Sequence, residues 1–173
     1  MFTPISIQSK NQITMDLITT SLPTGTQIKN ISFNQEGVLV CGEMPLILDT
    51  PPPPLHSVAF FEKIDSHGRI LWLQKYWGDE HNSADAFIEV QDGYLLVGSA
   101  YSRYGSTFMI IKTDTNGNPQ WIRYSGDGQQ VIVKSISITG NGMYLINGVI
   151  KDWDYNSIQY KITIDVNGNM MIS

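Results

Sequence analysis

The feature that most constrains the fold of this chain is an internal repeat with a period of about fifty residues. Three segments align as strand, tight turn and strand, each with a glycine in the turn and a glycine at the end. They are residues 29–42, 85–98 and 134–148. A second hairpin pattern follows each of them. Its copies are residues 61–72, 111–121 and 163–172. Each unit therefore contains four short strands.

The turn of the second hairpin fixes the period. Three aspartates, each followed three positions later by a glycine, recur at matching offsets, and these residues are Asp65, Gly68, Asp114, Gly117, Asp165 and Gly168. A tryptophan follows in the first two copies, as Trp72 and Trp121, whereas the third copy has Ile172. The interval between the first two units is longer because of an insertion that contains Pro51–Pro54.

The strand pattern predicts an all-β fold whose sheets are covered on both faces. The turns supply the Gly, Asn and Asp residues that tight hairpins need. The middle strands are continuous apolar runs, as in 94–97 and 108–111, and do not alternate. We predict a β-propeller-like array of about three and a half four-stranded antiparallel blades in one domain, 1–173. The blade ranges are a half blade over 1–27 and blades over about 28–78, 79–126 and 127–173. A β-sandwich or another stacked β-repeat is the alternative.

The motif Asp-x-x-Gly-x-x-x-Trp, which spans 65–72 and 114–121, resembles the Trp-motif β-propeller repeats of bacteria and archaea. It is similar, more distantly, to the quinoprotein (PQQ-like) blade, whose turn is one residue longer. The resemblance covers the chain from about residue 28 onward. It implies that Trp72 and Trp121 pack between neighbouring blades, while the Asp and Gly residues shape the turn. Such repeats serve enzymes, scaffolds, lectins and assembly factors, so the resemblance implies a fold and no single function.

Composition excludes several classes of partner. The formal net charge is -5, and the 11 Lys and Arg residues form no basic stripe, so neither nucleic acid binding nor membrane insertion is expected. No signal peptide pattern is visible, and the chain is expected to be soluble, with a composition compatible with extracellular or surface exposure. Its compartment stays open. Cys41, the single cysteine, lies in an apolar run and is interpreted as a core residue.

The number of blades indicates a protein partner. Three and a half blades are fewer than closed propellers use, and an open arc exposes strand edges and apolar faces at its ends. We therefore expect self-association or other protein subunits. Alternatively, the segment 5–19 and the short strand 170–172 complete a fourth blade within one chain.

Functional residues are expected at the end of the array that carries the variable connections, because the opposite end has uniform tight turns. The candidate ligand-binding residues there are Tyr101, Arg103, Tyr104, Asp152, Trp153 and Asp154. Aromatic rings stack on sugars, and neighbouring polar groups bind the hydroxyls, so a glycan is one interpretation. The same residue types are typical of protein interfaces, which is the favoured interpretation.

No catalytic constellation stands out. The local set that could bind a metal or transfer protons is Asp79, Glu80, His81 and Asp85. Its spacing matches no ligand pattern, and a solvated acidic loop is the simpler interpretation. His56 and His67 stand alone, and the turn 114–118 lacks the closing acid of a calcium loop. We predict no catalytic residue, no metal site and no cofactor, the quinone included.

The first hypothesis is a non-enzymatic structural or protein-interaction module that acts in a homo-oligomer or a larger assembly. The alternative is a carbohydrate-binding lectin that uses the variable loops. A hydrolase or lyase with its site on the same loops ranks third.

Overall fold

A computed structural model describes residues 22–46, 56–78 and 80–172, and every regular element in these ranges is a strand. The strands of the first half are β1 (Gln27–Asn34), β2 (Gly37–Pro45), β3 (Ser57–Asp65), β4 (Ile70–Tyr76), β5 (His81–Val90) and β6 (Gly93–Ser102). Those of the second half are β7 (Gly105–Thr113), β8 (Pro119–Gly128), β9 (Gln130–Ile138), β10 (Tyr144–Lys151), β11 (Ser157–Ile164) and β12 (Met170–Ile172). The predicted all-β class is confirmed. No helix with the length and apolarity needed to cross a membrane occurs in the described ranges.

The twelve strands form three antiparallel four-stranded units. Unit 1 is β1–β4, unit 2 is β5–β8 and unit 3 is β9–β12, and within each unit every strand pairs with the next. Units 1 and 2 join through one parallel pair, Ser57 with His81. Most of the expected half blade over 1–27, and the prolines of the insertion, lie outside the described residues. β12 pairs with β11 as the fourth strand of unit 3, and the segment 5–19 lies outside the described residues.

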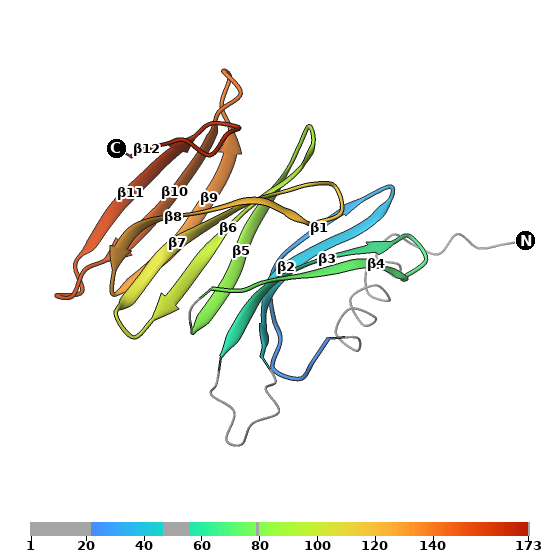
Figure 1. The fold of residues 1–173 in the computed structure, drawn as a ribbon, viewed down its shortest axis with the longest axis horizontal. Coiled ribbons are helices and arrows are strands. Elements are labelled where there is room, and N and C mark those ends of the chain that lie inside the picture. The colour runs from blue at the N-terminus through green and yellow to red at the C-terminus, as the bar shows by residue number, and fades with distance from the viewer. Residues whose placement is uncertain (1–21, 47–55, 79, 173) are drawn as a thin grey trace, which may run out of the picture.

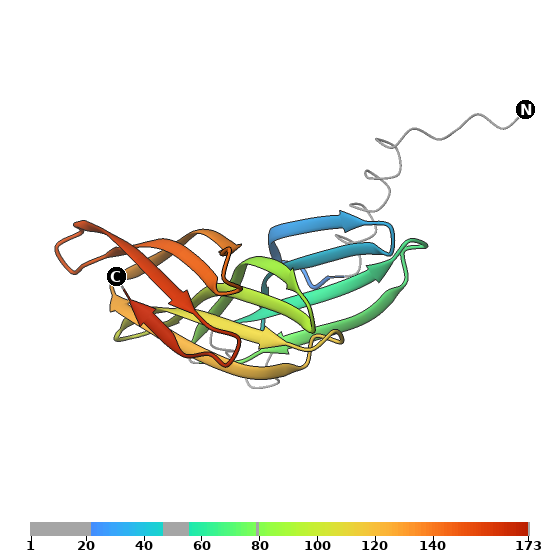
Figure 2. The ribbon, with the colours of Figure 1, turned by 90° about the horizontal axis from the view of Figure 1, so that it is seen from above.

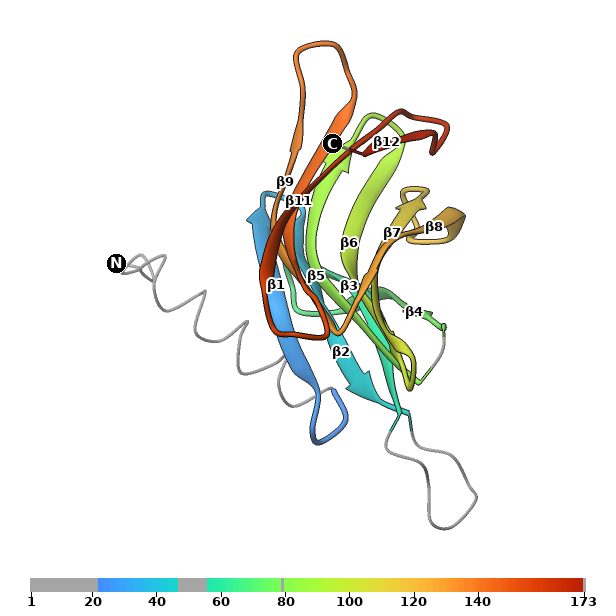
Figure 3. The same ribbon diagram turned by 90° about the vertical axis from the view of Figure 1, so that its left-hand side faces the viewer.

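The three units stack in chain order, from unit 1 at the blue end to unit 3 at the red end (Figure 1). Their first strands, β1, β5 and β9, lie along one side of the stack, and their fourth strands lie along the other (Figures 2 and 3). Neither hydrogen-bonded sheet closes on itself within the described ranges. The array is therefore open.

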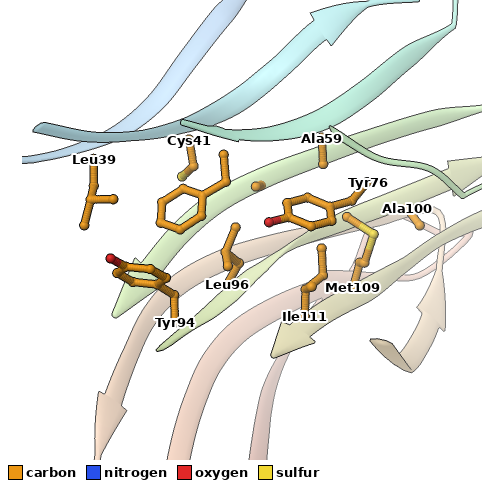
Figure 4. Close-up of a cluster of buried hydrophobic side chains, with 11 residues drawn as sticks. Leu39, Cys41, Ala59, Tyr76, Tyr94, Leu96, Ala100, Met109 and Ile111 are labelled. Carbon is orange, nitrogen blue, oxygen red and sulfur yellow. The ribbon is translucent and has the colours of Figure 1, made fainter. Parts of the chain in front are cut away.

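Unit 1 packs on unit 2 through a large apolar core. Side chains of β2 and β3, including Leu39, Cys41 and Ala59, point toward Leu96 and Ile111 of unit 2 (Figure 4). Burial raises the pKa of the Cys41 thiol, as expected for a core cysteine.

Phe61 lies at the centre of this core. Its ring centroid is 5.2 Å from that of Trp72, 4.9 Å from Phe87 and 5.1 Å from Tyr94. Tilted and edge-on aromatic pairs of this kind add to the stabilisation from buried area. The opposite face of unit 2 packs on unit 3 in the same way, with Phe108 stacked on Tyr160 at 5.5 Å. The middle strands of unit 2 are thus buried on both faces, as their apolar runs predict.

The outer face of unit 3 differs from the corresponding faces of units 1 and 2. Counted from the glycine that ends the first hairpin, Asn147 occupies the position of Cys41 and Val97. Counted from the turn aspartates, two further core positions become polar, with Lys161 in place of Phe61 and Ile110, and Gln159 in place of Ala59 and Phe108. Asn147, Gln159 and Lys161 are wholly or partly exposed. At these three positions the outer face of unit 3 is therefore more polar than the corresponding faces of units 1 and 2.

The motif tryptophans contact the next unit. A β-carbon on Gly117 would lie 2.9 Å from the Trp72 ring, and one on Gly168 would lie 3.3 Å from the Trp121 ring. Hydrogen bonds accompany both contacts. The Tyr76 hydroxyl donates to the Gly117 carbonyl at 2.7 Å, and the Trp121 indole donates to the backbone carbonyl of Val166 at 3.3 Å. The same contact between units therefore occurs twice, one period apart.

The Trp72 contact predicts a large effect of Gly117→Ala on stability. Gly142 serves as the control because both glycines have left-handed φ angles, +76° and +78°, but nothing lies within 4 Å of a β-carbon at Gly142. We expect Gly142→Ala to lower the free energy of unfolding by about 1 kcal/mol, the cost of the backbone conformation. Gly117→Ala should cost about 1–3 kcal/mol more through overpacking, as measured by urea unfolding. Equal losses in the two variants would contradict a packing role for this glycine.

Candidate functional site

The candidate ligand-binding residues lie on two neighbouring hairpin turns at one end of the array, the lower edge in Figure 1. Tyr101 is the second-last residue of β6, and Arg103 and Tyr104 form the β6–β7 connection that follows. The other three residues follow β10. A β-carbon on Gly105 would lie 3.3 Å from Cζ2 of Trp153, so the indole ring lies against the β6–β7 turn. The structure thus brings the two groups of candidates together.

This end of the array exposes large aromatic side chains. Tyr104 and Tyr155 are each 70% exposed and Trp153 is 62% exposed. The Arg103 guanidinium lies over the Tyr104 ring, 4.7 Å from its centroid, in a cation–π contact. We call Tyr101, Arg103, Tyr104, Trp153, Asp154 and Tyr155 the aromatic patch. The sequence had indicated all of these residues except Tyr155, which is the one non-glycine residue with positive φ (63°) in the described ranges.

Asp152, also a candidate, is engaged in its own turn. Its Oδ1 accepts hydrogen bonds from the backbone N–H groups of Asp154 at 3.0 Å and Asn156 at 2.8 Å. Its Oδ2 accepts a hydrogen bond from the Asn156 side chain at 3.0 Å. The Asn156 side chain, followed by the backbone donors, lowers the pKa of this carboxyl. Both oxygens are therefore used to hold the β10–β11 turn, and the patch leaves Asp152 out.

The three motif aspartates form the same turn. Asp114 Oδ1 accepts hydrogen bonds from the backbone N–H groups of Asn116 at 2.8 Å and Asn118 at 2.9 Å. Asp65 and Asp165 repeat this arrangement in the β3–β4 and β11–β12 turns. The residue three positions after the aspartate is a glycine with positive φ in each motif copy, namely Gly68, Gly117 and Gly168. In the β10–β11 turn that position is Tyr155, so this exposed tyrosine adopts a backbone conformation that favours glycine.

The acidic set that includes Glu80, His81 and Asp85 does not form a solvated loop, because His81 and Asp85 belong to β5 and are partly buried. Asp79 lies outside the described residues. His56 does not stand alone. Its Nδ1 is 2.8 Å from the Glu80 carbonyl oxygen, and its ring centroid is 6.0 Å from that of His81. His67 remains exposed in the β3–β4 turn.

Ser57 links this histidine pair to a carboxylate. Its Oγ donates to Glu43 Oε2 at 3.4 Å and lies 3.4 Å from Nδ1 of His81. A hydrolytic triad needs the carboxylate on the histidine, where it orients the imidazole, and here the carboxylate contacts the serine instead. The cluster surrounds the single parallel pair that joins units 1 and 2. Among the described side chains no group of three or more His, Cys, Asp or Glu residues is arranged to hold a metal ion.

No protein-family model matches this chain, and no curated protein matches it in sequence.

Glu62 is a buried titratable residue that sequence reasoning missed. It is 0% exposed and lies on the face of unit 1 opposite the core with unit 2, beside an apolar cluster that includes Val40 and Phe60. Neither carboxyl oxygen has a hydrogen-bond partner within the described residues, and burial raises the pKa to about 7. The corresponding residues in the other units are Ile111 and Ile162. The repeat alignment therefore contained the signal, a carboxyl at a position that is otherwise apolar.

The turn geometry predicts that Asp152→Ala destabilises the chain and that Asp154→Ala does not. Asp152 holds three hydrogen bonds of the β10–β11 turn, whereas Asp154 contributes only its backbone N–H. We expect Asp152→Ala to lower the melting temperature by a few degrees at pH 7, measured by circular dichroism. The difference should shrink as the pH falls through the acid range, because the low-pKa carboxylate then becomes protonated. Equal melting temperatures for the two variants would show that Asp152 does not stabilise the turn.

Glu62 predicts a pH-dependent stability. An unfolded glutamate titrates near pH 4.3 and the folded residue at about 7, so the folded state holds the proton more tightly. The resulting stabilisation is complete below about pH 4 and is lost as the pH rises through 7. We expect Glu62→Ile to be more stable than the wild type at pH 8 by up to about 3 kcal/mol, with the advantage falling at pH 5. Urea unfolding at both values measures it, with the exposed Glu89→Gln as control. An advantage of Glu62→Ile that is independent of pH would contradict the assignment.

Proposed function

We propose that this chain is a non-enzymatic structural or protein-interaction module, built from β-propeller-type blades, that acts in a homo-oligomer. Three stacked four-stranded units support the blade assignment. The repeated contact of Trp72 and Trp121 with the next unit also supports it, since the resemblance to Trp-motif propeller repeats implies this contact.

The aromatic patch is the observation that carries the interaction role. Exposed tyrosine, tryptophan and arginine side chains are enriched at the centres of protein interfaces. Here they come from two adjacent turns that rigid strands hold in place. A surface that carries both Arg103 and Asp154 can pair with itself across a two-fold axis, because each charge meets its opposite on the second copy. A second copy of this chain is therefore the proposed occupant.

The polar outer face of unit 3 also favours association through the patch. A further blade stacked on this face to complete a ring would bury the exposed side chains of Lys161 and Gln159. Burying a lysine in this way is costly. Copies that meet through the loop-bearing end avoid the cost and leave the polar face in solvent.

A carbohydrate is the second candidate ligand. The Trp153 ring is largely exposed and has one edge against Gly105, so it offers a flat apolar surface. Arg103 lies over the Tyr104 ring and Asp154 follows Trp153 in the same turn, so both side chains can provide hydrogen bonds to hydroxyls. The same residues would then serve a lectin.

Sedimentation velocity of the purified chain tests self-association. We expect the wild type to sediment above the 19.4 kDa monomer at concentrations of about 10–100 μM. The double variant Tyr104→Ser with Trp153→Ser should sediment as a monomer, because both substitutions remove aromatic area from the interface. Phe33→Ser is the matched control, since Phe33 is also exposed but lies at the end of β1, next to the β1–β2 turn. It should associate like the wild type.

A monomeric wild type would overturn the homo-oligomer proposal, and so would association that survives the double variant. A glycan array tests the second candidate function, carbohydrate binding. Glycan binding that Trp153→Ser abolishes, in a chain that stays monomeric, would establish the lectin function instead.

A further inference from the structure

The first strand of every unit contains a β-bulge at the same place in the repeat. The pairing register shifts between Ile28 and Asn30, between Ala84 and Ala86, and at Asn147 opposite β9. The residues left without a partner on the neighbouring strand are Lys29, Asp85 and Lys134. A bulge re-aims the side chain of its extra residue, and in this chain that residue is charged in all three units.

Glycines of the second strands make these bulges possible. A β-carbon on Gly98 would lie 1.7 Å from the Ser83 carbonyl oxygen, and one on Gly42 would lie 2.0 Å from that of Gln27. Gly148 occupies the same position in unit 3. These glycines end the first hairpin in all three copies of the repeat. The period therefore specifies the bulge as well as the strands.

Two of the bulged residues line a cavity on the side of the array formed by the first strands. The cavity is open, with a volume of about 390 Å³, and elements of all three units contribute to it. Unit 1 provides Lys29 and Glu43, and unit 2 provides Asp85 with two serines. Unit 3 provides the segment 130–133 of β9, which includes three aliphatic residues. The aromatic patch contributes no residue.

The charges in this cavity are not balanced. Lys29 Nζ lies 3.3 Å from Glu43 Oε1, and Glu43 also accepts the Ser57 hydrogen bond. Asp85 accepts a hydrogen bond from Ser83 and forms no ion pair among the described residues. The one lysine of the cavity thus pairs with Glu43, and the second carboxylate has no ion pair of its own. Burial is the main cause that raises the pKa of Asp85, with the Glu43 charge acting in the same direction and Ser83 and Lys29 opposing it. A cation beside Asp85 would offset this cost.

We propose that the cavity binds a primary ammonium or guanidinium group, with Asp85 as its carboxylate partner and the aliphatic segment 131–133 of β9 beside its hydrocarbon stem. Ser83 and Ser99 line the cavity and offer hydroxyl oxygens that can accept the remaining N–H hydrogen bonds. The cation is the side chain of a basic residue in a partner peptide or a free small amine, and both have the same chemistry. This binding site is separate from the proposed self-association surface.

Calorimetric titration of the full chain at pH 7.5 tests the site with three probes. They are cadaverine, a short peptide with one central lysine, and the same peptide with that lysine N-ε-acetylated. We expect the lysine peptide to bind and its acetylated form to bind at least about tenfold more weakly, because a charge-assisted hydrogen bond is lost. Cadaverine binding equal to that of the peptide would identify a free amine as sufficient, and weaker binding would identify a peptide ligand.

Variants locate the site. Asp85→Asn should weaken binding of the lysine peptide by at least about tenfold, whereas Glu89→Gln, an exposed carboxylate on the same strand, should leave it unchanged. Circular dichroism checks that Asp85→Asn folds. Equal binding of the acetylated and unmodified peptides to the wild-type chain would overturn the proposal without any variant. The absence of binding by every amine up to about 10 mM would also overturn it.

Discussion

The structure depends on burial of the middle strands between successive sheets. In units 1 and 2 the second and third strands are buried on both faces, so each sheet must be covered on both sides. Unit 2 meets this need with two separate cores, one centred on Phe61 and one that includes Phe108. The Asp-x-x-Gly turn then becomes a contact between units, since its glycine is the surface on which the preceding tryptophan packs.

Polar substitutions end this arrangement in unit 3. Asn147, Gln159 and Lys161 replace core residues on one face only, while the other face keeps Ile146 and Ile162 for the core with unit 2. Unit 3 thus differs from the other two units through changes at a few positions on one face. The two surfaces proposed for partners are the loop-bearing end, with the aromatic patch, and the side lined by the bulged first strands. These surfaces differ in chemistry, because one is aromatic and the other holds Lys29, Glu43 and Asp85.

Local features of the fold were predictable from the sequence. The aspartate of each motif turn bonds to backbone groups two and four residues away, and the turn glycine provides the positive φ that the hairpin needs. The hairpins and the fifty-residue period follow from such short-range requirements. Five of the six aromatic-patch residues were also indicated, because each lies in a connection whose position the period fixes.

The sequence by itself determined the strands, their turns and the order of the three units, because these depend on contacts within a few residues. Only the tertiary structure decided which side chains from different strands meet. His56 approaches His81, and Lys29 shares a cavity with Asp85, through strand pairing and sheet stacking that no local pattern encodes. The burial of Glu62 was decided in the same way, because residue spacing shows that a carboxyl replaces an apolar side chain but not that the position is closed to water.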